Sequence, residues 1–311
     1  TDFAADLTIM EEATEFLRRV QSGGTLPLIT SCCPGWVKYC ETFHPDFIPN
    51  LSTCKSPQQM FGAMAKSYYA EKMGWDPKDI VFVSAIPCTA KKFEVGRAGQ
   101  SAAGVPDVDY AITTRELGRM IKAAGIDFRN IAEEPFDDPF NVSSGAGVIF
   151  GATGGVMEAA LRTAAEIILQ KPLEKLDFPE VRGTEGIKLA SYKLGDATVN
   201  VAVTSGTGNA KKLLRAVQSG EVKVDFIEVM ACPGGCVNGG GQPYQPASVR
   251  NNVDLRALRA AVLYKEDAQR DLRKSHENSA LKKIYDEYFG EPNSHKAHEL
   301  LHTHYVDRSG K

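Results

Sequence analysis

The sequence predicts an α/β fold of two lobes, each with a mostly parallel sheet flanked by helices, that enclose a cysteine-lined site. Short apolar runs typical of buried strands alternate with stretches of helical periodicity. Strands that alternate with helices in this way favour parallel pairing. The length of 311 residues is enough for two such lobes.

The first elements alternate helix, strand and helix. Residues 6–20 have apolar side chains at helical spacing, and a Gly-Gly break separates them from a short apolar strand over residues 26–29. Pro34 suits the first turn of a second helix. Ser56 is a good N-cap and Pro57 suits a first turn, so a third helix is predicted from there to about residue 72.

The middle of the chain contains a strand, a capped helix and a glycine-rich stretch. The run IVFVSAI over residues 80–86 predicts a buried strand. Thr113 is expected to cap a helix to about residue 124, with Glu116 in its first turn. The glycine-rich residues 145–155 lead into a helix from residue 156 to about residue 170.

The last elements are two strands and several helices. Strands over residues 199–204 and 226–230 flank a glycine-rich turn and helix over residues 206–217, and the region after Arg250 is polar and helical. The expected organisation is a first lobe over residues 1–130, a second lobe over 131–250 and a helical extension over 251–311.

The composition excludes several classes of protein. The 36 Lys and Arg nearly balance the 39 Asp and Glu, so a net charge of −3 gives no basic face for nucleic acid. No apolar run of 18 residues is present, so we expect no membrane-spanning helix. The first residues lack the basic segment of a signal peptide, which predicts a cytoplasmic protein. Because the chain begins at Thr1 rather than Met, we also expect it to be a fragment or a processed product.

The seven cysteines are the most informative residues. An odd number without a secretion signal indicates reduced thiols that pack, catalyse or bind metal. A lone cysteine such as Cys40 is expected to pack in the core. Five others follow the ends of expected strands, and the carboxyl ends of parallel strands meet in one crevice. These five, which we expect to converge, are Cys32, Cys33, Cys88, Cys232 and Cys236.

Four thiolates suit a [4Fe–4S] cluster or a zinc ion equally by number. Structural zinc sites usually use two close Cys-x-x-Cys pairs, and this chain has none. Cysteines scattered over about 200 residues favour a cluster buried between the lobes. The Pro and Gly residues around them let several backbone N–H groups point at sulfur, which supports an anionic cluster.

Three long segments of the chain resemble the signature motifs of [FeFe] hydrogenases. They are Thr30–Trp36 (TSCCPGW), Pro87–Glu94 (PCTAKKFE) and Glu228–Pro243 (EVMACPGGCVNGGGQP). The segments Leu7–Glu12, Gly145–Arg162 and Lys274–Asn278 resemble the same family, so the similarity runs along the whole chain.

The resemblance implies an iron hydrogenase of anaerobic hydrogen metabolism that catalyses 2H⁺ + 2e⁻ ⇌ H₂ at an H-cluster. By resemblance, Cys33, Cys88, Cys232 and Cys236 would hold its [4Fe–4S] part. Cys236 would also bridge to a diiron subsite with CO, cyanide and azadithiolate ligands. Cys32 would stay unligated and relay protons to and from this subsite.

The resemblance also implies roles for residues around the cluster. Glu12, Glu15 and Arg19 share one helix face, which alone would suit a solvated salt-bridge stripe. The family uses matching positions, with Ser52, as its proton path, and Lys91 would donate to a cyanide ligand. The residues expected to line the pocket are Ser56, Gln58, Phe150 and Met230.

The chain departs from the family pattern at two places. Ile86 stands where Met usually precedes Pro-Cys, and Pro139-Phe140-Asn141 stands where Pro-Met-Gly is usual. Loss of a polarisable thioether is expected to change the tuning of the cluster rather than its ligation. The resemblance further implies that an N-terminal part of the domain is missing from this chain, and no Cys-x-x-Cys-x-x-Cys segment for accessory clusters is present.

Two alternatives remain open within this resemblance. One is a hydrogen-sensing member of the family, which Ile86 would suit, and the other is a Narf-like, non-enzymatic iron–sulfur assembly protein. The presence of Cys32 weighs against both, and that of Glu12 and Glu15 against the second. In the enzyme, electrons would come from ferredoxin or from cluster-bearing partner subunits, and maturation proteins would load the site.

The string His298–His302 (HELLH) matches a motif of zinc hydrolases. Only nine residues follow it, so no distant third ligand is available on its C-terminal side. Because family members end in a similar His-rich helix, we interpret this string as structural.

Overall fold

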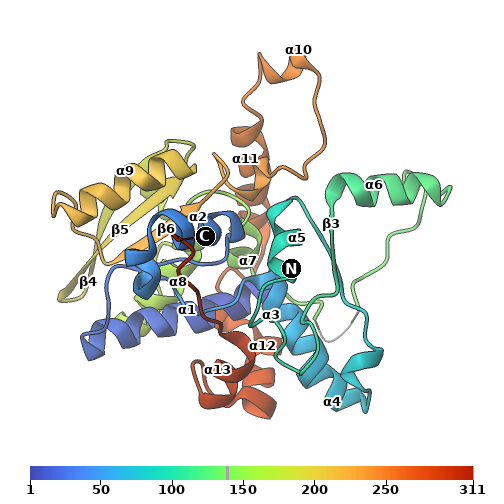
Figure 1. Ribbon diagram of the computed structural model, residues 1–311, viewed down its shortest axis with the longest axis horizontal. Coiled ribbons are helices and arrows are strands. Elements are labelled where there is room, and N and C mark those ends of the chain that lie inside the picture. Colours follow the sequence, from blue (N-terminus) through green and yellow to red (C-terminus); the bar gives the residue numbers. More distant parts are fainter. Residues whose placement is uncertain (138–139, 311) are drawn as a thin grey trace.

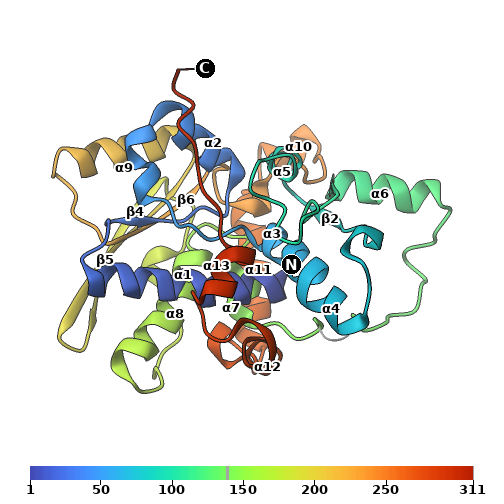
Figure 2. The same ribbon diagram turned by 60° about the horizontal axis from the view of Figure 1, so that its bottom comes forward.

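The computed structural model describes residues 1–137 and 140–310 and contains two sheets. The larger one has the strand order β1 (Leu28–Ile29), β6 (Phe226–Met230), β5 (Ala197–Ser205) and β4 (Ile187–Leu194). Its first three strands are parallel, and β4 is an antiparallel edge strand. The smaller sheet pairs β2 (Val83–Ile86) with β3 (Tyr110–Thr113) in parallel. The two sheets lie at opposite sides of the molecule (Figures 1 and 2), and the predicted α/β class is confirmed.

Helices cover both faces of the larger sheet. Successive residues of a strand point to opposite faces, so Val201 and Val203 pack with α1 (Asp2–Ser22) and α8 (Gly155–Leu169). Ala202, between them, packs with α2 (Pro34–Phe43) and α9 (Thr207–Gln218) on the other face. The helix α1 runs beneath this sheet toward the centre of the molecule (Figure 2). The packing therefore places one end of α1 between the two sheets.

The remaining helices surround this centre. Next to the start of α1, helix α3 (Pro57–Met64) passes through a π-helical turn (Ala65–Tyr69) into α4 (Ala70–Met73). The C-terminal helices α12 (Ser279–Ile284) and α13 (His295–Leu301) share a core with α1 and α3. The other α-helices are α5 (Ala90–Val95), α6 (Thr114–Ala123), α7 (Gly145–Ile149), α10 (Ala247–Arg250) and α11 (Leu255–Gln269). Short 3₁₀ turns span Pro45–Asn50, Pro77–Asp79, Pro179–Val181, Cys236–Asn238 and Ser275–Glu277, and a π-helical turn spans Tyr285–Phe289.

Several local predictions are confirmed. The strand over 226–230 is β6, and Pro34 is the first residue of α2. Thr113 and Glu116 form a capping box at the start of α6. Cys40 is fully buried in the core between the larger sheet and its outer helices. Within the described residues, no helix is long and apolar enough to cross a membrane.

Other predictions fail where the partners of an element decide its environment. The strand over 80–86 is not buried, because β2 belongs to a sheet of only two strands and Val83 is 51% exposed. The strands β3 and β4 are absent from the predicted elements; β3 is short and β4 alternates exposed with partly buried residues.

The division into two lobes near residue 130 stays a prediction. The larger sheet contains strands from both sides of that boundary. Its strand β1 comes from the first part of the chain, and its other three strands come from the second part. The hydrogen bonds between β1 and β6 therefore join the two predicted lobes through one sheet.

Candidate functional site

A cavity of about 340 Å³ lies at the carboxyl ends of β1, β2 and β6. The segments that follow these three strands carry the five cysteines that the sequence places together, as expected for ligands at strand ends of an open α/β sheet. Residues that line the cavity and were singled out from the sequence are Cys32, Cys33, Gln58, Ile86, Cys88, Lys91, Phe150, Met230 and Cys236.

The cysteines around this cavity lie close enough for the charge of one thiolate to raise the pKa of another. Burial raises the pKa of the Cys33 thiol, and the nearby Cys88 adds to the effect. Burial also raises the pKa of Cys232 to about 11, with contributions from Cys33 and Cys88. The pKa of Cys236 is raised by burial and then by the other three. Cys232 does not line the cavity but belongs to the same group of four.

The four sulfur atoms are more widely spread than the ligands of a single tetrahedral ion. A tetrahedral zinc ion with Zn–S distances of about 2.3 Å would hold its sulfur atoms about 3.8 Å apart. Among the described residues, no three of these sulfur atoms lie within 4.8 Å of one another. Backbone N–H groups also serve the sulfur atoms: that of Ala231 donates to Cys33 Sγ at 3.4 Å, and that of Gly240 bonds to Cys232. This donor set fits an anionic iron–sulfur cluster.

Cys32, the neighbour of Cys33, has different surroundings. Burial raises the pKa of its thiol well above the ordinary value, and the charge of Glu12 is the next cause. Cys33, by contrast, is the N-cap residue of α2 and receives backbone N–H groups. The two adjacent cysteines therefore face different partners, as the sequence-based assignment of separate roles requires.

Lys91 is held at the cavity by a carboxylate that the sequence reasoning did not single out. Its ammonium donates to Glu94 Oε2 at 2.9 Å and to the Cys32 carbonyl at 2.9 Å. Burial opposes the charge of Lys91, but Glu94 outweighs it and the pKa of Lys91 is raised. Glu94 also accepts from Ser56 Oγ at 2.9 Å and from Gln58 Nε2 at 3.2 Å. The position of Glu94, three residues after Lys91 on α5, is the signal that could have identified it.

Ser56 and Phe140 also lie away from the cavity wall. The Ser56 side chain turns to Glu94 and is not part of the wall, although Gln58 is. Phe140 packs on the rings of Phe3 and Phe61, with ring centroids 5.4 and 5.2 Å apart. Its neighbour Pro139 lies outside the described residues.

From Cys32, polar side chains continue to the surface along α1. Burial raises the pKa of Glu12 to about 8 against the effect of the nearby Ser52 hydroxyl. Ser52 Oγ donates to Glu15 Oε2 at 2.9 Å, and Arg19 Nη2 donates to Glu15 Oε1 at 2.6 Å. The Arg19 side chain is 15% exposed, so the series reaches solvent. The face predicted from the i, i+3, i+7 spacing is thus turned inward rather than toward water.

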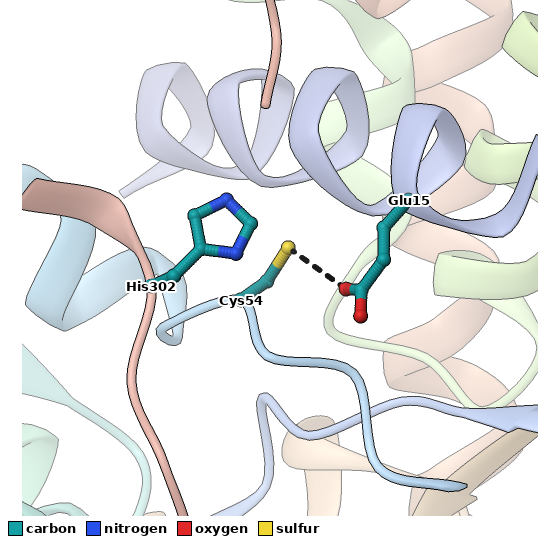
Figure 3. Close-up of side chains that lie close together, drawn as sticks. All are labelled: Glu15, Cys54 and His302. Atoms are coloured by element: carbon teal, nitrogen blue, oxygen red, sulfur yellow. Dashed lines mark hydrogen bonds between the residues drawn. The ribbon is translucent and has the colours of Figure 1, made fainter. Parts of the chain in front are cut away.

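A second polar group lies against Glu15 and was not foreseen. Figure 3 shows Cys54, Glu15 and His302, which come from three separate segments of the chain and point toward one another. All three are buried, and Cys54 Sγ donates to Glu15 Oε2 at 3.7 Å. We define these three residues as the Glu15–Cys54–His302 cluster.

Comparisons with known proteins agree with the cysteine motifs. Residues 1–240 match the family model of the iron only hydrogenase large subunit, C-terminal domain, and residues 253–308 match that of the iron hydrogenase small subunit. The chain is 52% identical over 314 residues to the NADP-reducing hydrogenase subunit HndD of Solidesulfovibrio fructosivorans, covering 99% of this chain and 53% of that protein. It is 48% identical over 304 residues to iron hydrogenase 1 of Clostridium pasteurianum, covering 98% of this chain and 53% of that protein. The chain thus spans about half the length of these curated relatives.

Solved structures and more distant relatives were also found. The structure of a single-residue variant of [FeFe]-hydrogenase HydA1 from Chlamydomonas reinhardtii matches with a TM-score of 0.85 and 45% identity, over 99% of this chain and 84% of that one. The cytosolic Fe-S cluster assembly factor narfl of Danio rerio is 30% identical over 317 residues, covering 98% of this chain and 75% of that protein. The similarity to hydrogenases is therefore clearly higher than that to assembly factors.

Proposed function

This chain belongs to the iron-only hydrogenase family, and we propose that it carries the catalytic domain of an enzyme that interconverts protons, electrons and H₂. The observation that carries the proposal is the connection of two features. A cavity next to four mutually close cysteines adjoins a buried series of acid–base groups that ends at the surface.

The residues that would hold the cofactor are Cys33, Cys88, Cys232 and Cys236 for a [4Fe–4S] cluster, with Cys236 shared by a diiron subsite that carries CO, cyanide and azadithiolate. When bound, this group would pass electrons between a partner and the reaction and would supply the iron at which protons and H₂ are interconverted. Lys91 would face an anionic ligand of the group, since Glu94 keeps it protonated at the cavity wall.

The side chains of this protein would move the proton. The Cys32 thiol is protonated at neutral pH because its pKa is raised, so its Sγ holds a proton beside the cavity. Glu12, with a pKa of about 8, can accept that proton and release it near neutral pH. The Ser52 hydroxyl then links Glu12 to Glu15, and Arg19 orients the Glu15 carboxylate at the surface end.

The alternatives are less well supported. Ile86 lines the cavity at the position where the family usually has Met, which is the feature that would suit a hydrogen sensor. A sensor does not need rapid proton transfer, however, and the acid–base groups proposed for such transfer, from Cys32 to Arg19, are all present here. The lower identity to an assembly factor, 30% against 52%, likewise favours the enzyme.

We further propose that electrons enter through the [4Fe–4S] cluster from ferredoxin or from cluster-bearing partner subunits, and that maturation proteins load the diiron subsite. The match to the small-subunit family and the similarity to a hydrogenase subunit support a partner of this kind. We also propose a cytoplasmic location, where thiols such as those at the cavity are kept reduced.

The function can be tested on anaerobically matured protein. Hydrogen evolution should accompany infrared bands of bound CO and cyanide, broad absorption near 400 nm and iron bound through cysteine. A colourless protein with one zinc per chain and no hydrogen evolution would contradict the proposal.

A further inference from the structure

The Glu15–Cys54–His302 cluster brings together three side chains that bind transition metals. Carboxylate oxygen, thiolate sulfur and imidazole nitrogen are the three kinds of ligand that zinc takes from proteins. One ligand atom of each residue lies within 4.8 Å of the other two, and all three residues are buried (Figure 3). Their spacing is thus closer than that of the four cysteines at the cavity.

The sulfur–oxygen distance in this cluster matches a tetrahedral ion. With a Zn–S distance of about 2.3 Å and a Zn–O distance of about 2.0 Å, sulfur and oxygen lie about 3.5 Å apart. The Cys54 Sγ and Glu15 Oε2 atoms are 3.7 Å apart. Only a small contraction is needed for both to contact one ion.

His302 has a ring nitrogen whose lone pair could bind a metal in place of its present donor, Thr53. Its Nε2 lies 3.0 Å from Glu11 Oε2, and Glu11 also accepts from the Tyr285 hydroxyl and the Asn293 N–H. Because Glu11 acts as an acceptor, the imidazole proton is assigned to Nε2, and Nδ1 keeps its lone pair. This lone pair now accepts from Thr53 Oγ1 at 2.7 Å. A carboxylate behind a histidine is the usual outer arrangement of a zinc ligand.

The charges around Cys54 also favour a cation. Burial raises the pKa of its thiol well above the ordinary value, and the carboxylates of Glu15, Glu12 and Glu11 add to the effect. The same negative charges attract a divalent ion that replaces the thiol proton. His298 is not a member of the cluster, although its ring packs against that of His302. The site therefore differs from a zinc-hydrolase site of the kind that the HELLH string suggests, in which both histidines would bind the metal.

We propose that Glu15, Cys54 and His302 form a binding site for Zn²⁺, with Glu11 as the outer carboxylate. Binding forms a bond from zinc to Cys54 Sγ and releases the thiol proton to solvent, with no change of oxidation state. In the zinc-bound state Glu15 Oε2 is engaged by the metal and no longer accepts from Ser52, a bond of 2.9 Å in this structure. Zinc therefore inhibits hydrogen turnover by interrupting the proton path, a consequence that rests on the proposed function.

Binding is tested with zinc alone, on protein that already carries its iron–sulfur cluster, so that the four cluster cysteines are occupied. Equilibrium dialysis should find one zinc per chain, and zinc X-ray absorption should show one sulfur at about 2.3 Å with nitrogen or oxygen at about 2.0–2.1 Å. The Cys54→Ala and His302→Gln variants should each lower the affinity about 100-fold or more, and Glu11→Gln about 10–100-fold. The buried Cys40→Ala variant is the matched control and should bind like wild type.

Two results would overturn the site: no bound zinc in the wild-type chain, or the same affinity in wild type, Cys54→Ala and His302→Gln. Thermal unfolding and cluster absorbance show whether each variant is folded. Of Cys54→Ala and His302→Gln, the first changes the size of the side chain less.

The effect on turnover is measured as the ratio of hydrogen evolution with and without zinc in matured protein. Zinc should lower turnover at least tenfold in wild type and Cys40→Ala, with a much smaller effect in Cys54→Ala. Zinc that binds with one sulfur ligand but leaves turnover unchanged would refute the inhibition and the role of Glu15 in the proton path, while the binding site would stand.

Discussion

Replacement of Glu12 by glutamine tests the proton path at its most buried carboxyl group. Glu12 is 1% exposed, and burial raises its pKa to about 8. A carboxyl group with such a pKa exchanges protons readily near neutral pH, whereas a glutamine of the same size cannot. Since positioned acid–base groups contribute about 10²–10⁴-fold, we expect hydrogen evolution by Glu12→Gln to fall by this factor, with the cluster retained.

The same substitution has a thermodynamic signature that is independent of turnover. The pKa of Glu12 rises from its ordinary value of 4.5 to about 8, so between these pH values the folded chain keeps a proton that the unfolded chain has lost. The contribution of Glu12 to the free energy of unfolding is therefore complete below about pH 4.5 and is lost as the pH rises to about 8. At about 1.36 kcal/mol per pKa unit, the loss is about 5 kcal/mol. Glu12→Gln should lack this part of the pH dependence.

The assay combines hydrogen evolution, infrared bands and iron content on one matured sample with denaturant unfolding at pH 5 and pH 8. Glu116→Gln is a suitable control, because Glu116 caps α6 and pairs with Lys92 away from the cavity. Normal turnover in Glu12→Gln, with iron retained, would refute the proposed path. An unchanged difference in stability between pH 5 and pH 8 would refute the buried, protonated state of Glu12.

Three further predictions concern the cavity. Cys32→Ala should keep its iron yet evolve hydrogen about 10²–10⁴-fold more slowly, and Cys32→Asp should recover part of the rate. Loss of iron in Cys32→Ala would show that Cys32, and not Cys33, is the cluster ligand. Cys88→Ser should lose most bound iron while Cys40→Ser keeps it, as iron analysis and absorbance near 400 nm would show, and the reverse result would contradict the ligand assignment. Glu94→Gln removes the main group that raises the pKa of Lys91, whereas burial, which lowers this pKa, remains. Lys91 should then lose its proton at a lower pH than in wild type, and the infrared bands of the matured site should shift at that lower pH. Identical infrared pH titrations would exclude Glu94 as the partner that keeps Lys91 charged.

The sequence predicts best where the signal is local. Pro34 begins α2, and the Thr113–Glu116 pair forms the capping box of α6, because both effects depend on a few adjacent backbone groups. The position of cysteines after strands was equally informative, since parallel strands bring their carboxyl ends to one edge without any knowledge of the loops. These signals were sufficient to place the cavity.

The sequence predicts less where a side chain chooses between partners that are distant in the chain. Ser56 is the N-cap residue of α3, but its hydroxyl bonds to Glu94 rather than to the helix. His302 is predicted as part of a structural helix, whereas its neighbours Thr53 and Glu11 lie 249 and 291 residues away along the chain. Hydrophobic periodicity reports which face of an element is buried and does not report which polar group it meets there.

Helix α1 shows why Glu12 in particular is suited to proton exchange. The helix buries four carboxyl groups, those of Asp6, Glu11, Glu12 and Glu15, and burial of charge is costly unless hydrogen bonds compensate it. Asp6, Glu11 and Glu15 each accept several hydrogen bonds from other segments. Of these four, only Glu12 has a buried oxygen without a hydrogen-bond partner.

Each hydrogen bond that a carboxylate accepts stabilises its charged form and so lowers its pKa. Further donors to the Glu12 carboxylate would therefore lower its pKa and weaken its hold on the proton that the proposed path would carry. With one oxygen unpartnered, burial dominates and keeps the pKa of Glu12 near 8. The proton can then pass between the Cys32 thiol, whose pKa is raised further, and the solvent end of the path.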